Sequence, residues 1–215
     1  MLFRSQRSGY HFDNFKFDPD QDKVTVLGNI DPFWSAELDE IVKLAQPKTW
    51  RTRGKGLDRP AKEYDQEDYD LKQFGYGKDF IVSDLTWEVP ESFNKIGIWF
   101  GMENSKMRLH VQRPGQMWNL HLDKLEKWNP EDPSKVMRVM IALNDWEPGH
   151  FFSYGNYTHT GWHAGDVTTF DWQNIPHSTA NAGHSPRITL QLTGVVTDKT
   201  RDFLRILGSR SPYKL

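Results

Sequence analysis

The segment RPGQMWNLHLDKLEKW, residues 113–128, carries the most informative pattern in this chain: His121 and Asp123 stand one residue apart in a stretch that reads as a strand. Residues i and i+2 of a strand point to the same face, so the imidazole and the carboxylate converge on one spot. Alone, such a pair is either part of a metal site or a charged pair on a sheet, because short motifs often match by chance. A third ligand and a cofactor anchor are needed to decide.

The third candidate ligand is His177, much further along the chain in TFDWQNIPHSTANAG. Arg187 follows it and opens the expected strand RITLQLTGVV, where Thr189 shares its face. Two histidines and one carboxylate are the ligands of the facial triad in non-haem Fe(II) oxygenases, which leaves open positions on the metal. The planar guanidinium of Arg187 suits bidentate pairing with a carboxylate.

The motifs RPGQMWNLHLD, HAGDVTTFDWQNIPHSTANAG and HSPRITL resemble the Fe(II)/2-oxoglutarate-dependent oxygenase superfamily, in particular its prolyl 4-hydroxylase and aspartyl/asparaginyl hydroxylase members. The resemblance covers roughly residues 96–200. Gly165 and Asp166 begin the strand before the second histidine, as in the family pattern. Thr189 stands where many members have serine, which keeps the hydroxyl. Residues 1–95 match no family pattern.

The resemblance implies a mainly β, cupin-like jelly roll, the double-stranded β-helix. It implies that His121, Asp123 and His177 bind Fe(II), and that Arg187 and Thr189 hold the 5-carboxylate of the co-substrate 2-oxoglutarate. The implied reaction uses O₂ to hydroxylate an unactivated C–H bond and releases succinate and CO₂, with ascorbate as a supporting reductant.

Two further residues are candidate cofactor contacts. Asn119 shares a strand face with His121 and could bond the 1-carboxylate of 2-oxoglutarate or support a metal ligand. Arg138 lies on the next expected strand, where the aspartyl-hydroxylase side of the family has a second arginine that contacts the cofactor. The alternative for Arg138 is a charge on a strand face.

Composition limits the remaining function classes. The chain has 215 residues and no cysteine, which excludes disulfides, thiolate ligands and a cysteine nucleophile. The 9 Trp and 13 Phe compensate for an apolar fraction of 37%, since each aromatic buries a large area. The net charge of −2 argues against a nucleic-acid partner. Without a signal-like or membrane-spanning apolar run, we expect a cytoplasmic protein.

Periodicity and turn signals predict one domain over residues 1–215, with an N-terminal support and lid region at 1–95 and a catalytic core at 96–200. The expected helices are 31–46, which Asp31 and Pro32 would start and Pro47 would end, and a capping helix at 198–208 stopped by Gly208. The expected strands are 96–100, 107–113, 118–123, 136–143, 149–154, 166–171 and 187–196.

Several alternatives stay open at this point. In HTGWH, His159 and His163 would form a two-histidine site if the segment were helical, although Gly161 argues for a loop. The basic run 51–59 is either a nucleic-acid or acidic-peptide contact or a solvated loop, which the net charge favours. The loop 124–135 is a lid or a plain connection.

For the substrate, the sequence favours a protein or peptide side chain, prolyl first, on resemblance alone. Oxidation of a nucleobase or a free small molecule is the alternative within the oxygenase class. A jelly-roll module that binds without catalysis is the alternative outside it.

Overall fold

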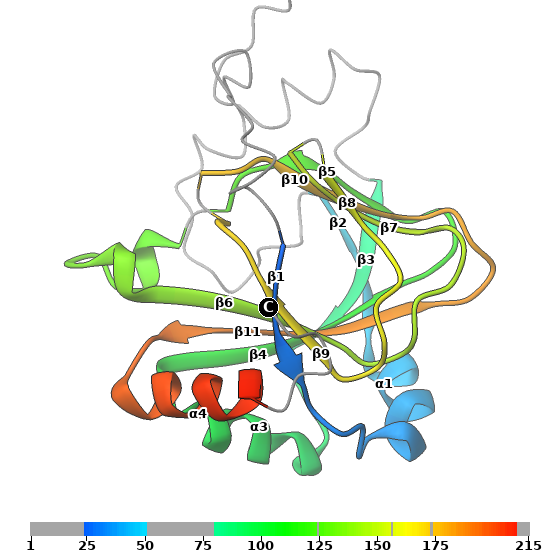
Figure 1. Ribbon diagram of the computed structural model, residues 1–215. Coiled ribbons are helices and arrows are strands. Elements are labelled where there is room, and N and C mark those ends of the chain that lie inside the picture. The colour runs from blue at the N-terminus through cyan, green and yellow to red at the C-terminus, as the bar shows by residue number, and fades with distance from the viewer. Residues whose placement is uncertain (1–23, 51–79, 124, 156, 173, 210–215) are drawn as a thin grey trace, which may run out of the picture.

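Two antiparallel sheets face each other in the computed structural model, which describes residues 24–50, 80–123, 125–155, 157–172 and 174–209 (Figure 1). The large sheet has the strand order β1 (Thr25–Asn29), β9 (Asp166–Thr169), β6 (Val136–Ala142), β11 (Arg187–Val195), β4 (Glu103–Gln112), β3 (Ile81–Thr86) and β2 (Gln46–Thr49). The small sheet has the order β5 (Met117–His121), β10 (His177–Asn181), β7 (His150–Tyr154) and β8 (Tyr157–His159).

The chain passes back and forth between the two sheets. From β4 to β11 it places β4, β6, β9 and β11 side by side in the large sheet, and β5, β7, β8 and β10 in the small one. Eight strands divided in this way form a double-stranded β-helix, or jelly roll. The predicted fold class is confirmed. Strands β1, β2 and β3 come from the N-terminal region and extend the large sheet.

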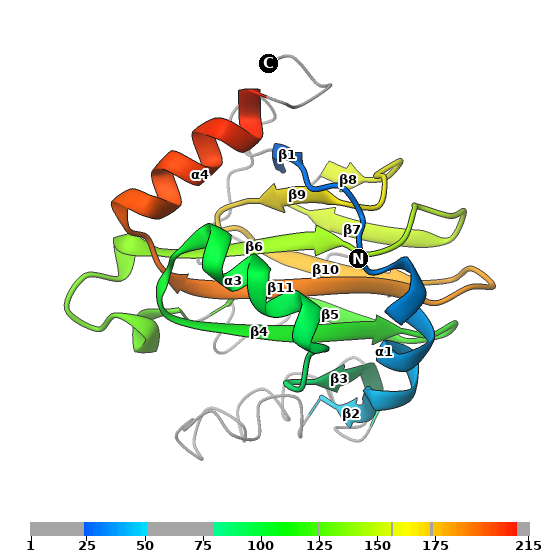
Figure 2. The same ribbon diagram turned by 90° about the horizontal axis from the view of Figure 1, so that it is seen from below.

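Two helices, α3 (Asn94–Phe100) and α4 (Asp198–Ser209), cover the outer face of the large sheet (Figure 2). The other helical elements are η2 (Ser35–Glu37), α1 (Leu38–Leu44), η3 (Glu91–Phe93), η4 (Glu126–Trp128) and η5 (Pro133–Lys135). Every helix among the described residues is too short or too polar to span a membrane.

The strand β11 shows how the two faces of the large sheet differ. One set of its side chains is apolar and belongs to the main hydrophobic core under the helices: Ile188, Leu190 and Leu192. The alternate set lines a pocket between the two sheets: Arg187, Thr189 and Gln191. The main core therefore lies between the large sheet and the helices, and the space between the sheets holds polar groups.

The strand predicted at 96–100 is wrong, because this segment is the helix α3. Phe93, Ile96 and Phe100 are fully buried and recur at the i, i+3, i+7 spacing of one helix face. Gly101, with φ 58°, provides the left-handed residue that ends the helix. A short apolar run does not distinguish a buried helix from a strand by periodicity alone.

The helix predicted at 31–46 is shorter than expected. It begins with the 3-10 turn η2, so Asp31 and Pro32 lie before it, and it ends at Leu44. Pro47 lies in β2, the last strand of the large sheet, where a missing N–H is tolerated. The other expected strands and α4 are confirmed with shifted ends, although Gly208 lies inside α4. Five strands were not predicted: β1, β2, β3, β8 and β10.

Gly165 lies just before β9, against the residue that follows β1, and has no room for a side chain. Its φ is +91°, and a Cβ there would lie 2.0 Å from the carbonyl oxygen of Ile30. Its own carbonyl accepts a hydrogen bond from Ile30 N at 2.9 Å, so the two segments cannot separate easily. We expect Gly165→Ala to lower the free energy of unfolding by about 3 kcal/mol, measured by urea denaturation.

Gly115→Ala is the matched control for Gly165. Its φ is +84°, yet nothing lies within 4 Å of the position of its Cβ. This variant should lose only the cost of a left-handed conformation, about 1 kcal/mol. Equal losses in the two variants would contradict the steric explanation.

Candidate metal centre

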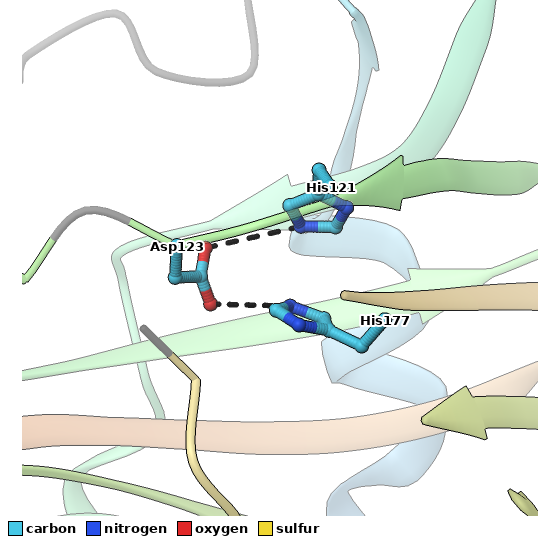
Figure 3. A group of neighbouring side chains, drawn as sticks. All are labelled: His121, Asp123 and His177. Atoms are coloured by element: carbon cyan, nitrogen blue, oxygen red, sulfur yellow. Dashed lines mark ion pairs between the residues drawn. The ribbon is translucent and has the colours of Figure 1, made fainter. Parts of the chain in front are cut away.

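His121, Asp123 and His177 converge on one another (Figure 3), and all three line the pocket between the sheets. His121 is the last residue of β5, and it is paired with His177, the first residue of β10. Asp123 follows β5, and its backbone N–H donates to the carbonyl of Trp172 at 2.9 Å. One ligand atom from each of the three residues lies within 4.8 Å of the others.

Both imidazoles are oriented by backbone carbonyls. His121 Nδ1 lies 2.6 Å from the carbonyl oxygen of Asn119, and His177 Nδ1 lies 3.1 Å from that of Ile175. A carbonyl can only accept, so each Nδ1 carries a proton, and each Nε2 is the ring nitrogen left to face the cluster. Hydrogen bonds of this kind are the usual outer support of metal-bound histidines.

The separations between the ligand atoms fit a metal ion. Asp123 Oδ1 lies 3.8 Å from His121 Nε2, and its Oδ2 lies 3.4 Å from His177 Nε2. Adjacent ligands at metal bonds of about 2.1 Å stand roughly 3 Å apart, so small side-chain adjustments suffice. The buried His177 Nε2 makes no hydrogen bond to any described residue. The cluster is therefore capable of holding a metal with two nitrogens and one oxygen.

Arg138 contacts the carboxylate of this cluster. Its Nη1 donates to Asp123 Oδ2, and its Nε donates to Thr193 Oγ1 at 2.9 Å. Burial alone would raise the pKa of Asp123, but the charge of Arg138, with contributions from His177 and His121, holds that pKa well below its usual range. Asp123 is therefore ionised and ready to bind a cation at neutral pH.

Removal of Arg138 should destabilise the metal-free protein. We expect Arg138→Met to lower the free energy of unfolding at pH 7 by about 2–3 kcal/mol, because the half-buried Asp123 carboxylate loses its charge partner. Asp123 has a depressed pKa in the folded state, so this loss should be present above pH 4 and shrink as the pH falls through the folded pKa. Urea unfolding at several pH values measures it.

Two comparisons sharpen the Arg138 experiment. Saturating Mn²⁺ should recover part of the lost stability, because the ion replaces the guanidinium as the partner of Asp123. Arg201→Met removes an exposed arginine that pairs with Asp198 on α4, and it should change the stability little. A loss in Arg138→Met that is independent of pH would mean that packing, not charge, is responsible.

Arg187 and Thr189 also lie in the pocket, on β11. The Arg187 Nε and the Thr189 Oγ1 are buried and make no hydrogen bond to any residue that the structure describes. Burial lowers the pKa of Arg187 to about 10, so the guanidinium is still cationic at neutral pH. The cavity volume is about 80 Å³, enough for several water molecules or a small acid.

A second set of polar side chains, from β4 and β11 of the large sheet, faces the same pocket. Arg108 Nε donates to His110 Nε2 at 3.0 Å, and Arg108 Nη2 donates to Gln191 Oε1 at 3.2 Å. Burial, together with the charges of Arg108, Arg187 and Arg138, holds the pKa of His110 well below its usual range. His110 is therefore a neutral acceptor in this network.

Asn119 does not line the pocket, although the sequence places it on the ligand face. The pairing of β5 with β10 shifts register between His177 and Thr179, whose partners are His121 and Trp118. The irregularity brings Trp118 into the pocket beside His121. Asn119 supports His121 through its backbone carbonyl, and its side-chain Oδ1 is buried without a hydrogen-bond partner among the described residues.

The helical two-histidine alternative is wrong. His159 ends the strand β8, and His163 lies in the turn that follows. The His163 side chain is 69% exposed and lies 3.8 Å from Asp145, while His159 faces the pocket. The basic run 51–59 lies outside the described residues, as does Lys124 at the start of the predicted lid.

Arg108, His159 and Trp162 line the pocket, although they were not predicted to belong to the site. Arg108 lay in an expected strand, as many residues do, and His159 and Trp162 lay in the segment HTGWH, which was expected to be a loop. Which strand face meets the pocket depends on the pairing of distant segments, which a single sequence does not show.

Comparison with known proteins gives distant structural relatives only. No family model and no curated protein matches the chain. A prolyl-4-hydroxylase from Pseudomonas putida is 16% identical, with a TM-score of 0.40, and the match covers 76% of this chain and 100% of that chain. A predicted oxalate decarboxylase from Thermotoga maritima is 14% identical, with a TM-score of 0.35 and coverage of 53% and 81%.

A cupin 2 conserved barrel domain protein from Salinispora arenicola is 13% identical, with a TM-score of 0.33 and coverage of 58% of this chain and 84% of that chain. The strand order of the chain itself identifies its fold as a cupin-like double-stranded β-helix with a His-Asp-His cluster that can bind a metal.

Proposed function

We propose that the protein is an Fe(II)- and 2-oxoglutarate-dependent oxygenase that hydroxylates an unactivated C–H bond. One observation carries this proposal: a cluster of two imidazoles and one carboxylate shares a pocket with the buried, cationic Arg187. A pocket for an uncharged ligand, such as a sugar, would not require a buried guanidinium.

In this proposal, His121, Asp123 and His177 hold Fe(II) through Nε2, a carboxylate oxygen and Nε2. Each Nδ1 already donates to a backbone carbonyl, which leaves Nε2 to face the metal, so the ligands need little rearrangement. When bound, Fe(II) supplies the activation of O₂ and the oxidation of the C–H bond. The protein supplies orientation and a pocket that limits the access of water.

Arg187 and Thr189 hold the distal carboxylate of 2-oxoglutarate. The bound carboxylate satisfies two buried polar atoms that otherwise have no partner among the described residues. A charge-assisted pair with Arg187 also fixes the position of the co-substrate, because the guanidinium fork restricts the angle of approach. The keto acid end then faces the metal cluster.

The proposed substrate is a protein or peptide side chain, prolyl first, and this choice rests on the sequence resemblance. A nucleobase or a small molecule is the alternative substrate, and a binding module is the alternative function. Incubation with Fe(II), ascorbate and 2-oxoglutarate should yield succinate, followed by products of +16 Da when a peptide library is added. Tight metal binding without any succinate, with or without peptides, would favour the binding module.

A further inference from the structure

His159 places an unused polar atom in the pocket. It is the last residue of β8, in the small sheet, and Gly161 with φ +73° turns the chain so that Trp162 returns against it, with ring centroids 5.6 Å apart. His159 Nε2 is buried and makes no hydrogen bond to any described residue.

The same indole lies against Arg187. The Cζ atom of Arg187 stands 5.2 Å from the ring centroid of Trp162, so Trp162 touches both His159 and Arg187. Thr189 lies two residues beyond Arg187 on the same strand face. The small sheet therefore contributes His159, and the large sheet contributes Arg187 and Thr189, to one region of the pocket.

Each of these residues has a buried polar atom without a partner in the described structure: Arg187 Nε, Thr189 Oγ1 and His159 Nε2. Buried polar atoms are nearly always hydrogen-bonded, so three in one region call for a ligand with several acceptor oxygens. A carboxylate has two oxygens and about four lone-pair sites, which matches three donors.

The imidazole suits the role of a neutral donor. Burial lowers the pKa of His159, the charge of Arg187 lowers it further, and Asp166 opposes them in part. His159 is thus uncharged at neutral pH and can donate one N–H without adding a second cation beside Arg187. Asp166 itself is occupied by Asn29 and by the backbone N–H of His163.

We propose that His159 is a third binding residue for the distal carboxylate of the keto acid, together with Arg187 and Thr189. This inference rests on the proposed function and deepens it. His159 contacts only the distal end of the co-substrate. It therefore selects dicarboxylic over monocarboxylic keto acids and has no part in binding the metal.

The test compares two ligands that differ only at the distal end. These are 2-oxoglutarate and 2-oxopentanoate, which has a methyl group in place of the distal carboxylate. Binding to the full-length protein loaded with Mn²⁺ is measured by titration calorimetry. In His159→Leu, the affinity for 2-oxoglutarate should fall at least tenfold, the size expected for one hydrogen bond to a charged group, while that for 2-oxopentanoate should not change.

Three further variants control for structural effects. His159→Gln has an amide nitrogen that reaches close to the Nε2 position, so it should recover much of the affinity for 2-oxoglutarate. His159→Asn has an amide that stops short, so it should behave like His159→Leu and serves if the leucine variant does not fold. His163→Leu changes an exposed histidine four residues away and should bind both ligands as the wild type does.

The outcomes separate this inference from the proposed function. Unchanged 2-oxoglutarate affinity in His159→Leu, or equal weakening of both ligands, would overturn the role of His159 and leave the proposed function standing. A wild-type protein that binds Mn²⁺ but not 2-oxoglutarate would overturn the proposed function, and the inference with it.

Discussion

His121→Ala should abolish succinate formation while the protein stays folded. The variant removes one of the three ligands, and the remaining His177 and Asp123 do not hold a divalent ion firmly enough for turnover. We expect activity to fall at least a thousandfold, on the order of the loss of a whole catalytic metal. Succinate release measures turnover, circular dichroism measures folding, and Mn²⁺ affinity measures metal binding.

The matched control for His121 is His163→Ala, which removes an exposed imidazole outside the pocket. This variant should retain wild-type turnover and metal affinity. Asp123→Ala should behave like His121→Ala, although Arg138 would then lose its partner and the variant would be less stable. Wild-type-like succinate release by His121→Ala would refute the metal assignment.

Arg187→Ala should raise the 2-oxoglutarate requirement strongly. A buried carboxylate that loses its guanidinium partner forfeits a charge-assisted pair, and we expect the apparent affinity to fall about a hundredfold or more. Turnover at saturating co-substrate should suffer less, because the metal ligands are intact. Succinate formation as a function of 2-oxoglutarate concentration separates the two effects.

Arg187→Lys provides the internal comparison. It keeps the positive charge and loses the planar fork, so the affinity should lie between those of the wild type and Arg187→Ala. Arg201→Ala, on the exposed face of α4, should leave the affinity unchanged. Unchanged affinity in Arg187→Ala would show that the co-substrate binds elsewhere in the pocket or not at all.

The strands that the sequence predicts are those with a clear local signal. The segments of β6, β7 and β11 combine apolar residues with nearby turn residues, and all three are strands in the structure. In contrast, β10 reads HSTAN, a polar stretch whose strand character comes from its two neighbours, β5 and β7. Such a strand has little local signal, since its pairing is decided by distant segments.

The candidate site also contains residues with a local sequence signal and residues whose position depends on the pairing of distant strands. The pair His121 and Asp123 was visible because the spacing alone brings the two side chains to one face. His177 and Arg187 were further candidates from the sequence, and the family resemblance gave them their expected roles. The role of Asn119 as a cofactor contact stays a prediction, and the register shift between β5 and β10 accounts for Trp118 lining the pocket beside His121. His159 was visible as a histidine but not as a pocket residue, because nothing in HTGWH indicates which residues lie opposite.

The strand β11 carries two sets of side chains with different structural roles. Its apolar residues pack under the helices, and its polar residues line the pocket, yet the two sets alternate along a single strand. The pocket-facing positions can therefore vary while the helix-facing positions keep the protein folded. On the proposed function, engineering of a new co-substrate preference should begin at Thr189, whose buried hydroxyl has no partner among the described residues, and should spare Gln191, which accepts a hydrogen bond from Arg108.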